Sequence, residues 1–249
     1  MKEVILIPSF EPDNRLIELI ESINKERFDI IVIDDGSGER YKDIFKKIEN
    51  DVTLISYDKN MGKGYALKKG IQYIKENYRD NYLIVTVDSD GQHKIDDAMK
   101  LCDYVKKNLD TYVLGKRKRG KNTPFRSMIG NSITKFVYYM VSGVNIYDTQ
   151  TGLRCFSSNL TDFMLSIPGN RFEYEMNVLL SAPKSGFLLH EIEIKTIYID
   201  KNKKSHFKTL KDAYIIYKSI MKYYPFICII MIAIIMFMLF GLFFLIKLL

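Results

Sequence analysis

The sequence contains few cysteines, and none of them is spaced for a shared task. Cys102, Cys155 and Cys228 are scattered, odd in number and without CxxC or paired Cys/His spacing. This pattern argues against a disulfide-built domain and against a structural zinc site. Reduced thiols of a cytosolic chain are expected instead.

Two nucleotide-binding motifs are also absent. The chain has neither the GxxxxGK[ST] spacing of a P-loop nor the GxGxxG fingerprint of a dinucleotide-binding fold. Their absence argues against an NTPase and against a dehydrogenase. The apolar N-terminal run in MKEVILIPSF is too short for the core of a signal peptide, so export is not expected.

Charged residues are unevenly distributed along the chain. The formal net charge is +7, yet residues 116–126 carry six cations and no acid, and residues 201–222 carry seven lysines against one aspartate. Each stretch contributes +6, so the other residues together carry −5. Two basic patches on an acidic body imply an anionic partner: a phosphorylated substrate, anionic lipid or nucleic acid. Nucleic acid is not expected, because no aromatic platform or RNA-binding signature accompanies the basic residues.

Apolar runs of strand length alternate with helical periodicities over the first 115 residues. This alternation is the signature of a doubly wound, mostly parallel α/β sheet with helices on both faces. The expected strands cover residues 4–8, 29–34, 52–56, 83–87 and 111–115, and the expected helices cover residues 13–24, 39–49, 63–76 and 95–107. Beyond residue 120 the alternation fails, and the expected elements are helices over 125–142 and 174–185 and a strand over 189–199.

The C-terminal part of the chain has a different pattern. Residues 209–224 place aromatic and apolar side chains at helical spacing with lysines on the other side, which predicts an amphipathic helix in a membrane interface. Packing of this helix onto the globular domain is the alternative, and both can hold. Residues 225–246 carry no charged side chain and could cross a hydrocarbon core of roughly 30 Å, which predicts a transmembrane helix rather than a buried core helix.

Lysines on the two sides of this span predict its orientation. Lys211, Lys218 and Lys222 precede it, and only Lys247 follows. The positive-inside rule then places the globular part in the cytoplasm. The expected organisation is a cytoplasmic domain over residues 1–207, an amphipathic interfacial helix over 208–224 and a single membrane pass over 225–246.

Polar residues follow the expected strands at the ends where parallel sheets bind ligands. The strand at 83–87 is followed by Asp88-Ser89-Asp90. Two carboxylates within one tripeptide repel each other unless a cation sits between them or one is protonated. Oxygen ligands suit Mg²⁺ or Mn²⁺, ions that keep some waters and reach substrate phosphates. We therefore expect Asp88 and Asp90, with Gln92, to hold a Mg²⁺ or Mn²⁺ ion that bridges a diphosphate.

Two further loops contain candidate binding residues. Asp34-Asp35-Gly36-Ser37 follows the strand at 29–34. Asp35 or Ser37 could cap the next helix, or a carboxylate here could accept hydrogen bonds from the ribose or base of a nucleotide. The loop from Asn60 to Ala66 opens a helix with small residues around Lys63.

Seven motifs in order resemble those of one enzyme family: IPSF, DDGS, NMGKGYALKKG, DSDGQH, TQTGLR, RFEYEM and SHF. Together they look like the inverting family 2 glycosyltransferases of GT-A fold, and most like the dolichol-phosphate mannosyltransferase-like and bactoprenol glucosyltransferase-like branch. The resemblance covers residues 4 to about 217. It implies transfer of a sugar from a nucleotide diphosphate to a polyprenyl phosphate at the bilayer. A separate flippase or downstream glycosyltransferase would then handle the lipid-linked sugar.

The resemblance also implies roles for individual residues. The expected donor-binding residues are Pro8, Phe10, Asp34, Asp35, Lys63, Asp88, Ser89, Asp90, Gln150, Arg154, Ser205, His206 and Lys208. Arg117 and Arg126 are expected to face the acceptor phosphate, and the expected catalytic residues are Asp90, Arg117 and Glu175. One departure is the first loop, which reads Phe10-Glu11-Pro12 where many relatives read Tyr-Asn-Glu. A base contact through that tyrosine or asparagine is therefore not expected.

The chemistry of such a reaction agrees with these residues. Negative charge develops on the leaving diphosphate, and a divalent ion with nearby cations stabilises it. A phosphate monoester, with a second pKa of about 6, is already an anionic nucleophile near neutral pH and requires no general base. A hydroxyl on a cell-wall polymer or glycolipid would need one, for which Glu173 and Glu175 are candidates. A non-catalytic nucleotide-sugar-binding scaffold is the remaining alternative, and the intact DSD and SHF motifs argue against it.

Overall fold

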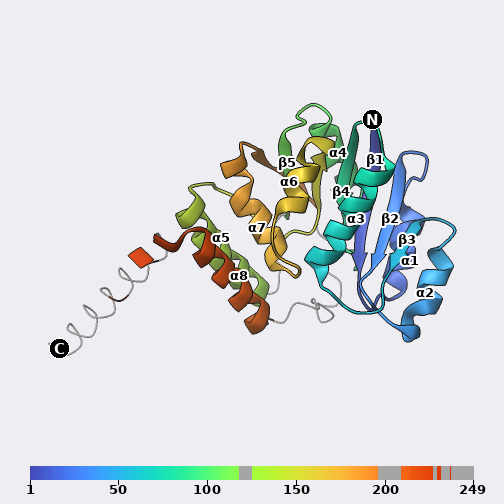
Figure 1. Cartoon of the computed structure of the whole chain (residues 1–249), viewed down its shortest axis with the longest axis horizontal. Helices are drawn as coiled ribbons and strands as arrows, with labels where there is room; N and C mark the ends of the chain where they lie inside the picture. Colours follow the sequence, from blue (N-terminus) through green and yellow to red (C-terminus); the bar gives the residue numbers. More distant parts are fainter. Residues whose placement is uncertain (118–124, 196–208, 227–228, 231–235, 237–249) are drawn as a thin grey trace.

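A seven-stranded sheet forms the centre of the computed structural model, which describes residues 1–117, 125–195, 209–226, 229–230 and 236 (Figure 1). The strand order is β3-β2-β1-β4-β6-β5-β7. The strands are β1 (Lys2–Ser9), β2 (Phe28–Asp34), β3 (Thr53–Ser56), β4 (Tyr82–Thr86), β5 (Thr111–Arg117), β6 (Arg154–Ser157) and β7 (Leu188–Ile194). Within this sheet β6 runs antiparallel to its neighbours β4 and β5, and the other pairings are parallel.

The strands expected from the sequence are confirmed, with one addition. All five residues of β4 are buried, and in β1 only Lys2 is exposed, because both strands lie in the middle of the sheet with helices on each face. The strand expected at 189–199 is β7, which ends at Ile194. Residues 196–199 lie outside the described part. The antiparallel β6 was not expected, because its four residues include Arg154 and Ser157 and form no apolar run.

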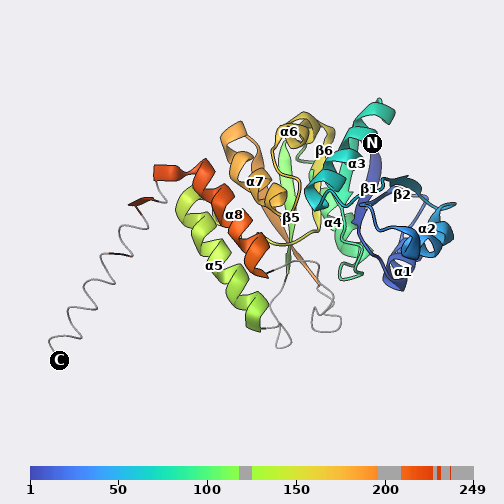
Figure 2. The same cartoon turned by 60° about the horizontal axis from the view of Figure 1, so that its bottom comes forward.

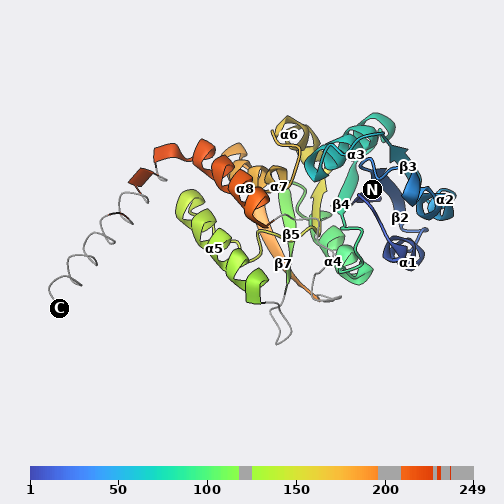
Figure 3. The same ribbon diagram turned by 90° about the horizontal axis from the view of Figure 1, so that it is seen from below.

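Helices cover both faces of the sheet, as the alternation predicts. They are α1 (Asn14–Ser22), α2 (Lys42–Ile48), α3 (Lys63–Asn77), α4 (Ile95–Val105), α5 (Phe125–Ser142), α6 (Thr161–Ser166), α7 (Glu173–Ser181) and α8 (Thr209–Tyr223). Figure 3 shows α1 and α4 on one side of the strands and α3, α6 and α7 on the other. Side chains alternate between these faces, so β1 contributes Ile5 and Ile7 to one core and Val4 and Leu6 to the other. The short helix α6 was not expected.

Helix α8 packs against the globular part, as the alternative interpretation of residues 209–224 proposes. Ile216 and Ile220 are buried in the core that also contains α7, and α8 lies beside α5 (Figure 2). The hydroxyls of Thr134 on α5 and Tyr217 on α8 are 3.4 Å apart. Other side chains of α8 remain outside, and Tyr214 is 66% exposed. Contact with a membrane interface therefore stays a prediction for the outer face of α8.

The predicted membrane pass lies mostly beyond the described residues. Of residues 225–246, the structure describes 225–226, 229–230 and 236. Within the described residues, no helix combines the length and the apolar character needed to cross a bilayer. The two described cysteines, Cys102 and Cys155, are buried free thiols, as expected.

Candidate active site

The polar loops after β1, β2 and β4 open onto one cleft of about 1060 Å³. The strand register explains this arrangement, because Ser9 pairs with Asp34 and Leu6 pairs with Thr86, so the strands end near the same edge. Ligand clefts have volumes of roughly 300–1,000 Å³, so a nucleotide-sized molecule fits here. The residues expected from the sequence that line the cleft are Pro8, Phe10, Asp35, Lys63, Asp88, Ser89 and Asp90.

Asp35 organises the loop that leads into α3. Its buried carboxylate accepts hydrogen bonds from the hydroxyl of Tyr57 (2.8 Å) and from the backbone N–H groups of Met61 (2.8 Å) and Gly62 (2.9 Å). The side-chain amide of Asn60 donates a further bond at 3.1 Å. Burial, followed by the hydrogen bond to Asp35, raises the pKa of Tyr57. Neutral groups of the chain therefore satisfy this carboxylate, although the residue lines the cleft.

The loop after β2 is closed by local hydrogen bonds. Oδ1 of Asp34 accepts from the N–H of Ser37 (2.9 Å), and the hydroxyl of Ser37 accepts from the N–H of Glu11 (2.9 Å). Gly36 has a φ of +70°, and a Cβ there would lie 2.4 Å from the carbonyl carbon of Lys59. Neither the turn at Glu39–Tyr41 nor α2 has a side-chain cap, so the helix-capping interpretation of Asp35 and Ser37 is wrong.

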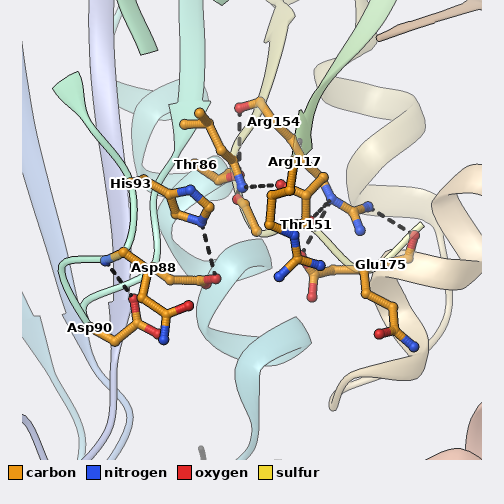
Figure 4. A network of polar contacts seen from close by, with 12 residues as sticks. Thr86, Asp88, Asp90, His93, Arg117, Thr151, Arg154 and Glu175 are labelled. Carbon is orange, nitrogen blue, oxygen red and sulfur yellow. Dashed lines mark hydrogen bonds and ion pairs between the residues drawn. The ribbon is translucent and has the colours of Figure 1, made fainter. Parts of the chain in front are cut away.

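Asp88 is held by groups on both of its oxygens. Oδ1 lies 2.8 Å from Nζ of Lys63. Oδ2 lies 3.6 Å from Nε2 of the buried His93 (Figure 4). Burial alone would raise the pKa of Asp88, but the charge of Lys63 and the contact with His93 outweigh burial and hold this pKa far below its usual value. Asp88 is therefore an ionised carboxylate that the chain itself compensates.

Asp90 has a different environment from Asp88, two residues away. Its Oδ1 accepts a hydrogen bond from the backbone N–H of Gln92 at 3.1 Å. Among the described side chains, no lysine or arginine forms an ion pair with Asp90. Burial, and then the neighbouring charge of Asp88, raises the pKa of Asp90. This carboxylate therefore carries negative charge for which the described chain supplies little compensation.

Gly152 allows the segment before β6 to approach the carboxylate of Asp88. A Cβ at this position would lie 2.0 Å from Oδ2 of Asp88. The hydroxyl of Thr86 donates to the carbonyl oxygen of Gly152 at 2.8 Å and fixes the backbone there. Any larger residue at position 152 would displace Asp88 or the backbone.

Arg154 is a buried residue that binds three backbone carbonyl groups beneath the site. Its Nε donates to the carbonyl of Thr151 (2.8 Å), Nη1 donates to the carbonyl of Glu175 (3.0 Å), and Nη2 donates to the carbonyl of Thr149 (3.3 Å). Burial lowers the pKa of Arg154, but the nearby Tyr112 and Glu175 raise it more. The carboxylate of Glu175 lies between Nε of Arg154 (3.5 Å) and Nζ of Lys63 (3.0 Å).

Arg117 pairs with a buried carboxylate at the end of β5. Its Nε and Nη2 lie 2.5 and 2.9 Å from the two oxygens of Asp148. Burial would raise the pKa of Asp148, but the hydrogen bond and charge of Arg117 lower it below its usual value. Glu191 on β7 accepts the backbone N–H groups of Tyr147 and Asp148, both at 2.8 Å. The segment around Asp148 is thus clamped to β5 and β7.

Two lysines beside this clamp lie over one aromatic ring. Nζ of Lys116 on β5 and Nζ of Lys135 on α5 lie 4.7 and 4.5 Å from the ring centroid of Tyr147. Neither lysine forms an ion pair with a carboxylate of the described residues. We call Lys116, Lys135 and Tyr147 the lysine pair site.

Residues 4–174 match the sequence model of the family described as Glycosyl transferase family 2, which covers more than half of the chain. The chain belongs to glycosyltransferase family 2. The protein is therefore a glycosyltransferase, and the resemblance drawn from its seven motifs is confirmed at the level of the family. In this glycosyltransferase, the loops that line the cleft are held in place by the sheet and the helices around it.

Relatives of this glycosyltransferase share most of its length. It is 29% identical over 217 residues to the UDP-N-acetylglucosamine–dolichyl-phosphate N-acetylglucosaminyltransferase of Methanococcus voltae, covering 79% of this chain and 86% of the relative. It is 27% identical to the dolichyl-phosphate beta-glucosyltransferase of Saccharomyces cerevisiae, covering 80% and 68%. The crystal structure of glucosyl-3-phosphoglycerate synthase from Mycobacterium tuberculosis, in complex with Mn²⁺, UDP and glucosyl-3-phosphoglycerate, superposes with a TM-score of 0.63 at 14% identity, covering 90% and 80%. This last likeness is one of fold.

The glycosyltransferase brings most of its expected site residues together, in two groups. One group lines the cleft, and the other, Arg154 with Glu175, reaches it through Lys63. Gln150 is exposed, and its backbone N–H binds Asp148. Ser205, His206, Lys208 and the side chain of Arg126 lie outside the described part of the structure. The individual roles of these residues stay predictions.

Several residues of the site were not expected from the sequence. Tyr57 and Tyr112 bind Asp35 and Arg154 through their hydroxyls, and each stands in an ordinary β-rich segment without a motif. Asp148 directly precedes the TQTGLR motif, and its partner Arg117 lies 31 positions away. Gly152 in the TQTGLR motif could have been noticed in the sequence, because a glycine at a strand often marks a place where another group comes close to the backbone.

Proposed function

We propose that this glycosyltransferase moves a hexose-type sugar, with inversion, from a UDP- or GDP-sugar to a polyprenyl phosphate at the cytoplasmic face of a membrane. The main support for a nucleotide-sugar donor is the cleft of about 1060 Å³, which has Asp88 and Asp90 on its wall. The hydroxyl of Ser9 also lines it, and among the described residues this buried oxygen has no hydrogen-bond partner. A nucleotide would supply one. The names of the archaeal and yeast relatives, which act on dolichyl phosphate, support the acceptor class.

A divalent ion fits the cleft at Asp90. Burial and the charge of Asp88 raise the pKa of Asp90, and a nearby cation would relieve this repulsion. Within the described residues, no three His, Cys, Asp or Glu side chains are grouped to hold a metal ion. Mg²⁺ and Mn²⁺ suit such a site, because they take few protein ligands and complete their shell with water and substrate phosphates. The Mn²⁺ in the complex of the mycobacterial synthase supports a divalent ion here.

The proposed reaction needs no proton transfer. An oxygen of the acceptor phosphate attacks the anomeric carbon, and the bond from that carbon to the diphosphate oxygen breaks, with its electron pair leaving on the nucleoside diphosphate. When bound, a divalent ion supplies positive charge to the leaving diphosphate. The cleft residues bind and orient the donor, and the phosphate monoester is anionic near neutral pH, with a second pKa of about 6. Glu175 lies between Lys63 and Arg154 and serves as a fixed carboxylate rather than a base.

Cations at the end of β5 support a phosphate-bearing acceptor. Arg117 is bound to Asp148 and sets the geometry of the neighbouring segment. The lysine pair site lies beside it and gathers two ammonium groups around one ring. We propose that Lys116 and Lys135 attract the acceptor phosphate together with Arg117 and Arg126.

The outer surfaces of α5 and α8 support binding to a membrane. Large apolar side chains are exposed on both helices: Phe136 (58%), Tyr139 (49%) and Met140 (42%) on α5, and Tyr214 (66%) and Met221 (50%) on α8. Exposed apolar patches rimmed by polar residues are typical of membrane-interaction sites. We propose that these helices rest on the bilayer and that residues 225–246 cross it once, with the globular part in the cytoplasm.

A transfer assay tests the proposal as a whole. Full-length protein in detergent micelles is supplied with Mn²⁺ or Mg²⁺, a panel of radiolabelled UDP- and GDP-sugars, and undecaprenyl or dolichyl phosphate. We expect label from one donor to enter the organic phase and to be lost with EDTA. Label that enters only when a polymer or glycolipid with free hydroxyls is added would refute the phosphate acceptor. Absence of turnover with every acceptor would refute catalysis and favour a binding scaffold.

A further inference from the structure

Lys63 joins two parts of the site that are far apart in the sequence. It opens α3, whereas Asp88 follows β4 and Glu175 lies in the first turn of α7. Nζ of Lys63 is 2.8 Å from Oδ1 of Asp88 and 3.0 Å from Oε2 of Glu175. One ammonium group therefore sets the spacing between two carboxylates that belong to different elements.

These three charged side chains are largely buried, and Lys63 and Asp88 also line the cleft. The side chains of Lys63, Asp88 and Glu175 are 17%, 30% and 12% exposed. Ion pairs with so little solvent are weakly screened, and removal of one partner leaves the others uncompensated.

The backbone of Lys63 is fixed on both sides, which limits how far its side chain can move. Before it, Gly62 donates to Asp35 at 2.9 Å. After it, the N–H of Tyr65 donates to the carbonyl of Asn170 at 2.9 Å. A Cβ at Gly64 would lie 2.5 Å from Cβ of Tyr174, so the start of α3 is in close contact with the start of α7. The ammonium group therefore has a defined place between Asp88 and Glu175.

We propose that Lys63 is a positioning residue that ties Asp88 to Glu175 and thereby leaves Asp90 as the carboxylate that meets the metal and the diphosphate. This inference rests on the proposed function, and it differs from the donor-binding role expected of Lys63 from the sequence. Asp88 then supports the site through Lys63 and His93, and Glu175 keeps a fixed place between Lys63 and Arg154, behind the wall of the cleft.

The test compares four variants of the full-length protein in micelles with wild type: Lys63→Met, Lys63→Arg, Glu175→Gln and the double variant Lys63→Met/Glu175→Gln. Lys69→Met is the matched control, because Lys69 is exposed on the same helix and lies over Tyr65 without contact to a described carboxylate. For each protein we would measure Mn²⁺ affinity without donor by electron paramagnetic resonance, donor Kd by calorimetry, kcat at saturating substrates, and Tm.

We expect Lys63→Met to lower kcat about 100-fold, the effect of misplacing a group by an ångström, while the donor and Mn²⁺ Kd values stay within about threefold of wild type. The double variant should be no slower than the slower single variant, because both changes break the same contact. Lys63→Arg should recover part of the rate. Lys69→Met should behave as wild type.

Two results would overturn the inference. One is a donor Kd that rises as much as kcat/KM falls while kcat is retained, since Lys63 would then bind the donor directly. The other is a double variant whose loss is the product of the two single losses. If Tm shows that Lys63→Met does not fold, Lys63→Arg and Glu175→Gln provide the same comparison. Wild-type failure to label a lipid phosphate would refute the proposed function alone, because the same ratios can be measured with a hydroxyl acceptor.

Discussion

The two acidic loops of the cleft have similar sequences but balance their charge in different ways. The loop after β2 contains Asp34 and Asp35, and the loop after β4 contains Asp88 and Asp90. In the β2 loop, hydroxyl and N–H donors of the chain bind the carboxylates, and no lysine or arginine of the described residues forms an ion pair with them. In the β4 loop, Asp88 has the ammonium of Lys63, whereas Asp90 has one backbone donor and a raised pKa.

This difference supports our proposal that the loop after β4 binds the metal and the diphosphate. Neutral donors do not cancel the negative charge of the β2 loop, but their hydrogen bonds fix the position of the loop. The carboxylates of this loop therefore stabilise the wall of the cleft. In the β4 loop, burial of two close carboxylates with one cation leaves an electrostatic imbalance. Perturbed carboxylates in a cleft are typical of functional sites. The imbalance at Asp90 would be corrected only when a cation or a substrate arrives.

The largest effect is expected for Asp90→Asn. Loss of this charge should lower metal-dependent transfer by about 10³-fold, the size reported for removal of one preorganised electrostatic group. Because the change also removes repulsion from Asp88, Tm should not fall. Initial rates with Mn²⁺ and with EDTA check the prediction. Asp34→Asn is the control from the other loop and should lose much less activity. Wild-type turnover in Asp90→Asn would contradict the assignment of the metal and the diphosphate to the β4 loop.

A smaller effect, on stability, is expected for Asp35→Asn. An amide cannot accept all the hydrogen bonds from Tyr57, Met61 and Gly62, so the free energy of unfolding should fall by about 2–3 kcal/mol, the range for hydrogen bonds to charged groups. Urea denaturation measures the change. Asp34→Asn removes one contact and should cost about 1 kcal/mol or less. Equal losses in both variants would contradict the framework role of Asp35.

Asp148 is a third carboxylate near the site, and the charge of Arg117 balances it. Asp148→Asn should cost about 2 kcal/mol at pH 7, within the range for hydrogen bonds to charged groups, because Arg117 loses its carboxylate partner. The folded-state pKa of Asp148 lies below the unfolded value of about 3.9, so its stabilisation is complete above that pH and is lost as the pH falls through the folded-state pKa. The difference between wild type and variant in urea denaturation should therefore be constant from pH 7 to about 5 and shrink below about 4. If the stability difference between wild type and variant instead grew below about pH 4, a lowered folded-state pKa of Asp148 would be contradicted.

A smaller effect than that of Asp35→Asn or Asp148→Asn is expected for Tyr57→Phe. The change deletes one of the donors to Asp35 and leaves the ring in place, which should cost about 1 kcal/mol. The ring contact with Tyr65 should persist. Urea denaturation of the variant alone and in the Asp35→Asn background forms a double-mutant cycle. Additive losses would show that the two residues act independently, against the hydrogen bond described here.

Residues close together in the sequence were the predictable part of this molecule. The central strands β1, β2 and β4 were found because a buried parallel strand is a continuous apolar run, and the DSD motif was recognised because both carboxylates lie in one loop. Pairs such as Arg117 with Asp148 and Lys63 with Glu175 were not predictable, since they depend on how β5, α3 and α7 pack. The division of roles between Asp88 and Asp90 was hidden for the same reason: the partner that distinguishes them, Lys63, belongs to another element.

The antiparallel strand β6 has a consequence for how the protein is made. All five residues of β4 are buried, yet the edge of β4 that faces away from β1 gains its partner only when residues 154–157 pair with it. At a synthesis rate of about 5–20 residues per second, the roughly 70 residues between β4 and β6 take about 4–14 seconds to emerge. During that interval the growing chain presents an apolar strand edge, a known template for aggregation. Nascent glycosyltransferase should therefore depend on ribosome-associated chaperones until β6 closes the sheet.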